Sequence, residues 1–365
     1  MGKFVISVRQ FMVILILYGV GTSILNIPAS ITGEAKQDAW ISSILGVVIS
    51  LLIIKLYITV GNLAPNLSLV EIYEQILGKW IGKLVSLTFI IVTLLAAGEL
   101  VFYVSNFMRT EIIPETPAYA INILFVLVIV YATYLGIETF ARSAEILFPF
   151  FVLLFIIFVV LISPQIDFHN VQPVLEVGAK PLISSTFIFI SGFSLPLFVL
   201  LMLFPSIINE NKDSGKAFYL GTIIAGIILI IVIALPILVL GAETTSQRTF
   251  PSYALAQRIS IGNFLERIEV IMGFMWIITI FIRTIMYFYA SVIGLTQILK
   301  LQDYRSIVLP LGMILVVLSL IVHPNIIHSN LYDKEIWPIL ALIHGLFLPL
   351  LLIVVAKVRN SFKPK

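Results

Sequence analysis

The chain has 365 residues, of which 60% are hydrophobic and only 11% charged, with a formal net charge of +3 and a mean hydropathy of +1.12. These values are typical of helical membrane proteins with many spans, and they leave no room for a large soluble domain. Because the sequence has no cysteine, disulfides, a thiolate nucleophile and a cysteine-based metal site are excluded.

About ten apolar segments are each long enough to cross a bilayer, so we expect a single transmembrane domain over residues 1–365. Lys3 and Arg9 precede the first segment as in a signal sequence, but the segment is too long and has no A-x-A-like cleavage site, which predicts a retained span. Pro149 predicts a kink in the fifth span. The predicted spans are residues 10–31, 39–60, 84–108, 118–135, 143–162, 182–205, 215–240, 268–298, 308–322 and 336–356.

Two intervals between spans have features of their own. Ser68 and Glu71 form a capping box before a stretch, residues 69–81, with one apolar face. With Trp80 at headgroup depth, this pattern predicts a helix that lies on the membrane surface. The polar interval 242–267 is a candidate lid or docking surface, and a simple connecting loop explains it equally well.

The first span is interrupted at Tyr18-Gly-Val-Gly-Thr-Ser-Ile-Leu-Asn-Ile-Pro28, where two glycines and a proline oppose a continuous helix. Ser191-Gly-Phe-Ser-Leu-Pro196 interrupts the sixth span. Unwound backbone at membrane depth must be buried in protein or line a wet cavity, and two such breaks at matching positions predict a transporter-type binding site. The alternative is that glycines only allow close helix packing, as Gly221-x-x-x-Ala225 is expected to do in the seventh span.

Basic residues set the orientation of the spans. Fourteen fall on one side and seven on the other, which predicts that both termini are cytoplasmic. Since five is an odd number, a second set of five spans enters the membrane inverted. The sequence therefore predicts an all-α polytopic membrane protein of two inverted five-helix repeats, residues 10–162 and 182–356, with spans 1 and 6 broken.

Two charges lie near the middle of spans: Glu99 in span 3 and Arg283 in span 8, which are symmetry mates under the predicted repeat. A lone charge at this depth costs roughly 2.5–3.5 kcal/mol, so each must face a cavity or a partner. Tyr103 and Tyr287 extend the polar faces by one turn. The two charges could contact a ligand, waters or each other, or form a structural pair that locks two helices together.

The two breaks supply the candidate ligand-binding groups. Amides at a half-helix N-terminus attract carboxylates, and carbonyls at a half-helix C-terminus attract cations, which suits a small zwitterion such as an amino acid. The candidate ligand-binding residues are Gly19, Gly21, Thr22, Ser23, Ser191, Gly192, Phe193 and Ser194.

The remaining polar side chains predict no chemistry. His323 and His328 lack acidic or thiol companions, so a metal site is not expected. His344 is expected to make a helix–helix hydrogen bond, with a proton relay as the alternative. No nucleotide-binding loop, nucleophile elbow or zinc signature occurs, so neither an enzyme nor a cofactor is predicted, and nucleic acid is not an expected partner.

Several fragments, in this order, resemble one family. They are Gly19-Val-Gly-Thr with Pro28, Gln172-Pro-Val-Leu-Glu-Val-Gly178, Ser191-Gly-Phe193, Pro251-Ser-Tyr253, Leu265-Glu-Arg-Ile-Glu269 with Trp276, and Gly294-Leu-Thr-Gln-Ile298. Together they resemble the B subunits of GerA-type spore germination receptors, within the amino acid–polyamine–organocation (APC) transporter superfamily. The resemblance covers essentially the whole chain.

This resemblance implies a LeuT/APC-like fold, a location in the inner membrane of dormant spores, and work beside an A subunit and a C-subunit lipoprotein. It also implies a germinant pocket at the broken helices, here Gly19 to Ser23 and Ser191 to Ser194. Asn26-Ile-Pro28 and Arg283 depart from typical permeases. The leading hypothesis is a nutrient-sensing receptor subunit. An amino-acid or ion-coupled permease, and a water or ion conduit gated by partners with Glu99 as a lining residue, are the alternatives.

Overall fold

The computed structural model describes residues 6–208, 211–258 and 269–359. By length and composition, eight helical stretches of these residues could cross a membrane, and α1 and α13 are two shorter apolar helices. One stretch, Ser23–Leu63, joins the second half of the predicted first span to the second span. The ten predicted segments are therefore all found as apolar helices, some of them joined end to end.

The helices have the following bounds: α1 Val8–Val20, α2 Ser23–Ala35, α3 Ala39–Leu63, α4 Leu69–Leu77, α5 Lys79–Phe107, α6 Ala118–Leu135, α7 Ile137–Ile162, α8 Ala179–Gly192, α9 Asn211–Leu240, α10 Ala242–Gln247, α11 Pro251–Gln257, α12 Glu269–Leu299, α13 Arg305–Ile321, α14 Ile326–Glu335, α15 Trp337–Leu342 and α16 Leu348–Arg359. Short 3₁₀ turns are η1 Lys36–Asp38, η3 Ser163–Gln165, η4 Phe168–Val171 and η5 Leu195–Met202, and π-turns are η2 Met108–Ile112 and η6 Ile343–Phe347.

Both predicted breaks are present. α1 ends at Val20, and Gly21 (φ +34°) turns the chain before α2 begins at Ser23. In the sixth span α8 ends at Gly192 and the chain continues as η5. One detail differs from the sequence prediction: Pro28, which was assigned to the first break, lies inside α2. The second half of the sixth span is a 3₁₀ helix.

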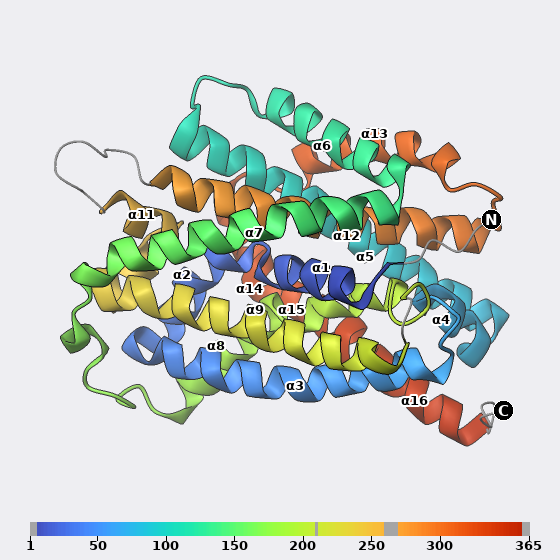
Figure 1. Cartoon of the computed structure of the whole chain (residues 1–365), viewed down its shortest axis with the longest axis horizontal. Coiled ribbons are helices and arrows are strands. Elements are labelled where there is room, and N and C mark those ends of the chain that lie inside the picture. The colour runs from blue at the N-terminus through green and yellow to red at the C-terminus, as the bar shows by residue number, and fades with distance from the viewer. Residues whose placement is uncertain (1–5, 209–210, 259–268, 360–365) are drawn as a thin grey trace.

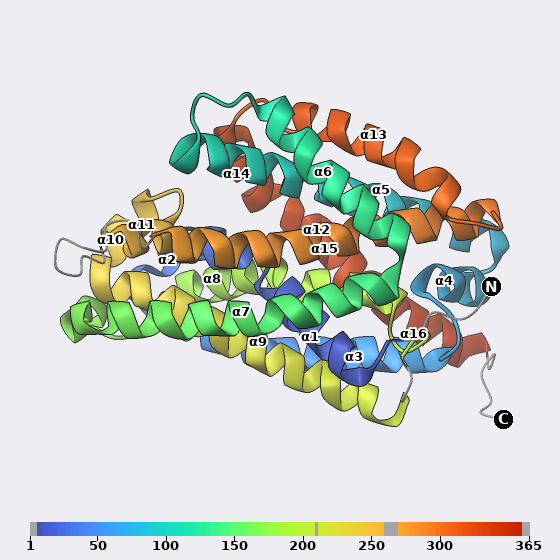
Figure 2. The same ribbon diagram turned by 45° about the horizontal axis from the view of Figure 1, so that its top comes forward.

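Most of the long helices form two packed groups. One group is α5, α6, α12 and α13, and the other is α1–α2, α3, α8–η5 and α9 (Figures 1 and 2). In the predicted repeat, spans 3 and 4 correspond to spans 8 and 9, and spans 1 and 2 to spans 6 and 7. Each packed group thus contains whole pairs of predicted symmetry mates, although the repeat bounds 10–162 and 182–356 stay a prediction.

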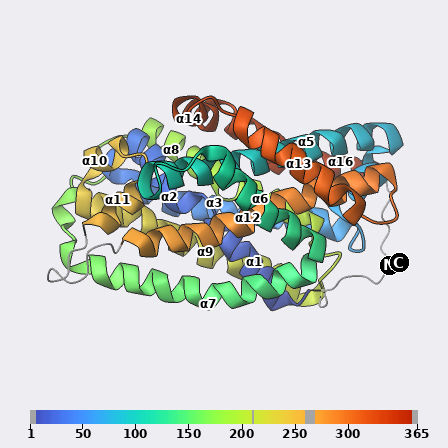
Figure 3. The ribbon, with the colours of Figure 1, turned by 90° about the horizontal axis from the view of Figure 1, so that it is seen from above.

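Small residues let α9 approach α1. A side chain at Gly221 would meet Leu15 at 2.9 Å, and Ala225 lies 3.4 Å from the position that a Cβ on Gly19 would take. α1 also contacts α7 and α12, so it lies inside the bundle (Figure 3). The Gly221-x-x-x-Ala225 motif packs two helices together, as predicted.

The predicted surface helix is only partly correct. The capping box of Ser68 and Glu71 is present, but α4 ends at Leu77 because Gly78 (φ +89°) breaks it, and Trp80 belongs to α5. The apolar side chains of α4, including Ile72 and Ile76, are fully buried against protein. Trp80 is 85% exposed. The apolar face of α4 is therefore explained by packing against α5 and α16 rather than by contact with lipid.

The predicted interval 242–267 contains two short helices, α10 and α11, which pack over α2. Residues 259–268 lie outside the described residues, as does most of Leu265-Glu-Arg-Ile-Glu269. α10 and α11 lie at one end of the bundle, and α4 with the start of α1 and the end of α16 lies at the other (Figures 1 and 2). We refer to these as the α10 end and the α4 end.

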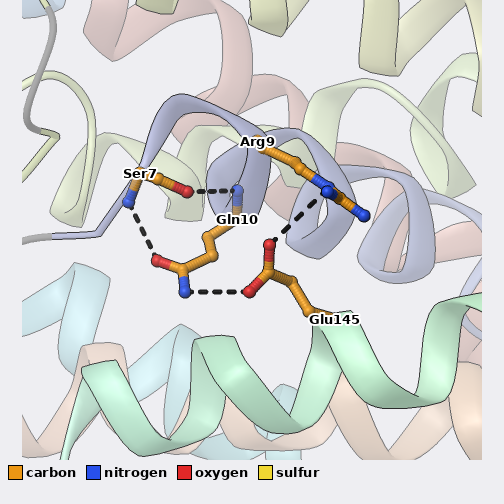
Figure 4. Close-up of polar contacts among 4 residues, drawn as sticks. All are labelled: Ser7, Arg9, Gln10 and Glu145. Carbon is orange, nitrogen blue, oxygen red and sulfur yellow. Dashed lines mark hydrogen bonds and ion pairs between the residues drawn. The ribbon is translucent and has the colours of Figure 1, made fainter.

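At the α4 end, a polar network anchors the start of α1 to α7 (Figure 4). Ser7 caps α1 by accepting a hydrogen bond from the Gln10 amide, and the Gln10 side chain accepts one from the Ser7 amide. Gln10 Nε2 donates to Glu145 at 3.0 Å, and Arg9 Nε lies 3.7 Å from the same carboxylate. Arg9, which was predicted only to orient the first span, therefore also joins α1 to α7.

Candidate ligand-binding site

A small cavity of about 80 Å³ lies between the two helix groups at the level of both breaks. The breaks contribute one wall, and α5, α12, α14 and α15 contribute the rest. The predicted site residues that line the cavity are Thr22, Ser23, Ser191, Gly192, Glu99, Tyr103, Arg283 and Tyr287. Eight of the twelve site residues predicted from the sequence therefore line one cavity.

Arg283 is the centre of this site. Its guanidinium donates to the Thr22 hydroxyl (3.2 Å), the Ser23 hydroxyl (3.5 Å) and the Gly192 carbonyl (2.9 Å). One side chain on α12 thus joins the ends of both broken helices. Two aromatic rings flank it, since its Cζ lies 5.3 Å from the Tyr18 ring centroid and 6.0 Å from that of Tyr287.

Gly21 makes room for this arginine. A Cβ at position 21 would lie 2.4 Å from Arg283 Cδ and 2.7 Å from the Tyr18 carbonyl, and its φ of +34° is unfavourable for residues with a side chain. Thr279, one turn before Arg283 on α12, donates to the Gly21 carbonyl at 2.9 Å. Gly21 does not line the cavity, but it allows α12 to approach the break.

Glu99 lies on the α5 wall of the same cavity and is only 4% exposed. No ion pair joins its carboxylate to Arg283 in the described part of the chain. Its Oε1 has no hydrogen-bond partner among the described residues, and the same is true of Arg283 Nε. A buried polar atom without a partner is costly, so both atoms are candidates to contact a ligand or water in the cavity.

Sequence reasoning missed two residues of the site, Asp333 and Trp337. The Tyr103 hydroxyl donates a short hydrogen bond to Asp333 Oδ2 and accepts one from Ser329 at 3.0 Å. Trp337 Nε1 donates to the Ser191 carbonyl at 3.0 Å. Both residues lie just before or at the start of predicted span 10, in a segment that has a mixed polar pattern, so the sequence contains no signal that α14 folds back toward the breaks.

The other four candidates lie beside the cavity rather than on it. A Cβ on Gly19 would lie 3.1 Å from the ring of Phe193, so Gly19 packs closely against that ring. The Ser194 hydroxyl donates to the Ile190 carbonyl of the preceding turn. On the α4 side of the breaks, the Tyr18 hydroxyl donates to the Pro196 carbonyl at 2.9 Å. Fully buried aromatic side chains therefore close the cavity toward the α4 end.

Toward the α10 end the cavity continues into a vestibule of about 360 Å³. The two spaces share Asn26, Ser30, Tyr103, Ile188 and Asp333. The wider space is bordered by residues 246–250 and by α14. The site is thus accessible from the α10 end and closed toward the α4 end.

The histidines lie apart from the cavity. His323 Nδ1 is 3.0 Å from His328 Nδ1, and Phe102 and Tyr332 pack around the His323 ring. Burial, and secondarily His328, lowers the pKa of His323 to about 4, so it is neutral near pH 7. His344 is buried in η6 and stacks on Phe198, and its Nδ1 has no partner among the described residues. The helix–helix hydrogen bond predicted for His344 is therefore not formed by that atom.

The fold is similar to those of two solved transporters. MhsT in complex with L-phenylalanine aligns with a TM-score of 0.66 at 14% identity, covering 99% of this chain and 100% of that one. Mhp1, a nucleobase-cation-symport-1 family transporter in a closed conformation with bromovinylhydantoin bound, aligns with a TM-score of 0.69 at 12% identity over 99% and 95% of the two chains. These likenesses confirm the predicted LeuT/APC-like fold.

The sequence is similar to those of germination proteins of Bacillus subtilis. Spore germination protein KB of Bacillus subtilis (strain 168) is 32% identical over 100% of this chain and 98% of its own. Spore germination protein A2 of the same organism is 28% identical over 79% of each chain. The model of the family described as spore germination protein matches residues 5–327. The chain therefore belongs to the spore germination protein family, which confirms the resemblance to germination receptor B subunits.

Proposed function

We propose that this protein is the membrane subunit of a spore germinant receptor, which binds a small nutrient, an amino acid, between the broken helices and signals germination together with an A subunit and a C-subunit lipoprotein. The observation that supports this most is the polar cavity at the two breaks, which is lined by Glu99 and Arg283, two residues that each have a buried polar atom without a partner among the described residues. A zwitterion supplies the opposite charges on one small molecule.

The carboxylate of the amino acid would bind at the start of α2. The amides of Leu25 and Asn26 already donate to the Thr22 carbonyl, but those of Ser23 and Ile24 have no backbone acceptor in the described part of the chain. Free amides and the helix dipole both favour an anion at this position. Arg283 lines the same cavity, and its Nε, which has no hydrogen-bond partner among the described residues, would supply a further donor.

The ammonium group would face the acidic wall formed by Glu99 and Asp333, which both line the cavity. Asp333 is held by Tyr103, and it lies on α14, which also borders the vestibule. Lys334, the next residue, is 3.1 Å from Glu34 of α2. Ligand bound to Asp333 would thereby connect α14 with the broken first span, which suggests how occupancy reaches the rest of the receptor.

A working permease is the second candidate, because the cavity is open at one end and closed at the other, as one state of an alternating-access transporter would be. The two functions can be distinguished with proteoliposomes that contain the purified protein. Each labelled standard amino acid is added in turn to the solution outside them. The receptor predicts saturable binding without accumulation inside the vesicles. Accumulation that grows with time and internal volume would establish a permease instead. No binding of any amino acid would contradict the proposed ligand class.

Asp333→Asn is expected to weaken amino-acid binding about 10- to 100-fold, because the variant loses a charge-assisted hydrogen bond to the ammonium group. Equilibrium binding of the labelled ligand to purified protein measures this. Glu335→Gln is the matched control, because this change removes a carboxylate from the same helix at an exposed position outside the cavity. Equal affinities of the two variants would exclude Asp333 from the ammonium site.

A further inference from the structure

The oxygen atoms at the two breaks form the type of site that binds a monovalent cation in transporters with broken helices. The Gly192 carbonyl lies at the C-terminal end of α8, where the helix dipole concentrates negative charge. The hydroxyls of Thr22 and Ser23, at the other break, line the same cavity, and the Ser23 hydroxyl donates to this carbonyl. In such proteins unwound carbonyls and half-helix C-termini coordinate the coupling ion. In this chain all three oxygen atoms instead accept hydrogen bonds from Arg283.

The fit of the guanidinium indicates a built position rather than an incidental contact. Arg283 is 3% exposed, its aliphatic stem occupies the space that Gly21 leaves open, and Thr279 of the same helix fixes the Gly21 carbonyl. The rings of Tyr18 and Tyr287 flank the charge. These neighbours stabilise the charge of the guanidinium or give its side chain room.

We infer that Arg283 is a tethered cation that takes the place of a dissolved coupling ion, so that the protein holds its two broken helices together and binds its ligand without Na⁺ or K⁺. The inference deepens the proposed function and rests on it, because it concerns the same site. Its physical basis is that a permanent charge already neutralises the C-terminal end of α8. A second cation at these oxygen atoms would meet the repulsion of the guanidinium at hydrogen-bond distance.

The first arm of the test does not depend on any amino acid. The melting temperature of the purified protein is measured in equal ionic strengths of NaCl, KCl and choline chloride, with and without millimolar ethylguanidinium. The native protein is expected to melt at the same temperature in all of them. Arg283→Ala is expected to melt lower and to regain about 2 °C or more with ethylguanidinium, or with Na⁺, because the emptied site can accept a free cation.

Arg142→Ala is the matched control, because this exposed arginine pairs only with Glu138 in the described part of the chain, and ethylguanidinium should not alter its melting temperature. Stabilisation of the native protein by Na⁺ or K⁺ over choline would overturn the inference. So would an Arg283→Ala protein that responds to ethylguanidinium no more than the control does.

The second arm measures amino-acid affinity in the same three salts. The inference predicts that the native dissociation constant changes less than about twofold when choline replaces Na⁺ or K⁺, and that Arg283→Ala loses at least about tenfold in affinity and recovers with ethylguanidinium. Markedly tighter native binding in Na⁺ or K⁺ would overturn it. If no amino acid binds in any salt, the proposed ligand fails, and the melting arm alone decides the inference.

Discussion

Gly21→Leu is expected to abolish the germination response of spores to nutrient while the protein still inserts in the membrane in normal amount. Even the first carbon of the new side chain would lie 2.4 Å from Arg283 Cδ, and φ of +34° disfavours any side chain there. Arg283 must therefore leave the break, and its three contacts with Thr22, Ser23 and Gly192 are lost. Germination is compared with a receptor-independent trigger, and protein amount with a blot.

Two further variants make this experiment specific. Gly21→Ala introduces only the clashing carbon and is also expected to lose the response. Gly215→Ala makes the same change on α9, where the added carbon would meet Ile58 at an ordinary distance of 3.7 Å, and it is expected to behave as the native protein does. A normal nutrient response in Gly21→Leu spores would remove the first break from the binding site.

Glu99→Gln is expected to reduce nutrient response about 10- to 100-fold at normal protein level, and Arg283→Gln is not expected to rescue it. In the structure both residues line the cavity, each has a buried atom without a partner, and no ion pair joins them among the described residues. Replacing the Glu99 carboxyl group therefore removes a ligand contact rather than half of a salt bridge. Response is measured as nutrient concentration for half-maximal germination, with protein level measured in parallel.

The double variant decides between this interpretation and a structural pair. If Glu99 and Arg283 stabilised each other, each single change would leave an uncompensated buried charge, costing roughly 3–5 kcal/mol, and the double change would recover part of the loss. Glu99→Arg combined with Arg283→Glu would restore attraction without restoring ligand contacts. A double variant more responsive than both single variants would contradict the cavity role of Glu99.

Much of the fold could be predicted because lipid imposes strong rules on sequence. The lengths of the apolar segments predicted the spans. Both breaks could be predicted from Gly19, Gly21 and Pro196, because the backbone freedom of glycine and the fixed geometry of proline act locally. The level of Glu99 and Arg283 was also predictable, because a helix rises by a fixed amount per residue. Packing of the apolar face of α4 on protein rather than lipid was not predictable, because both surroundings favour the same residues.

The acidic wall could not be predicted for a different reason. Asp333 lies in α14, whose polar residues give no sign of membrane depth, and it reaches the site only because α14 packs against α15 and brings it beside Tyr103. Likewise, Arg283 was predicted to face a cavity, but its hydrogen bonds to both breaks depend on the side-chain rotamer and on the approach of α12 to Gly21. Such contacts between distant segments leave no local pattern.

A single cysteine in this cysteine-free chain tests most directly whether the cavity receives its ligand from the α10 end. Ser30→Cys places a thiol where the cavity meets the vestibule. In intact cells, Glu115→Cys, beyond the end of α5, serves as an accessible site outside the vestibule, and Ser306→Cys, near the start of α13, as a site on the opposite side.

We expect a membrane-impermeant maleimide to label the Ser30→Cys and Glu115→Cys proteins from outside but not the Ser306→Cys protein. A mixture of the standard amino acids at millimolar concentration is expected to protect Ser30→Cys alone. Labelling of Ser306→Cys instead would show that the chain has the opposite orientation in the membrane. Labelling of Ser30→Cys that no amino acid slows, in protein that retains nutrient response, would contradict a ligand site between the broken helices.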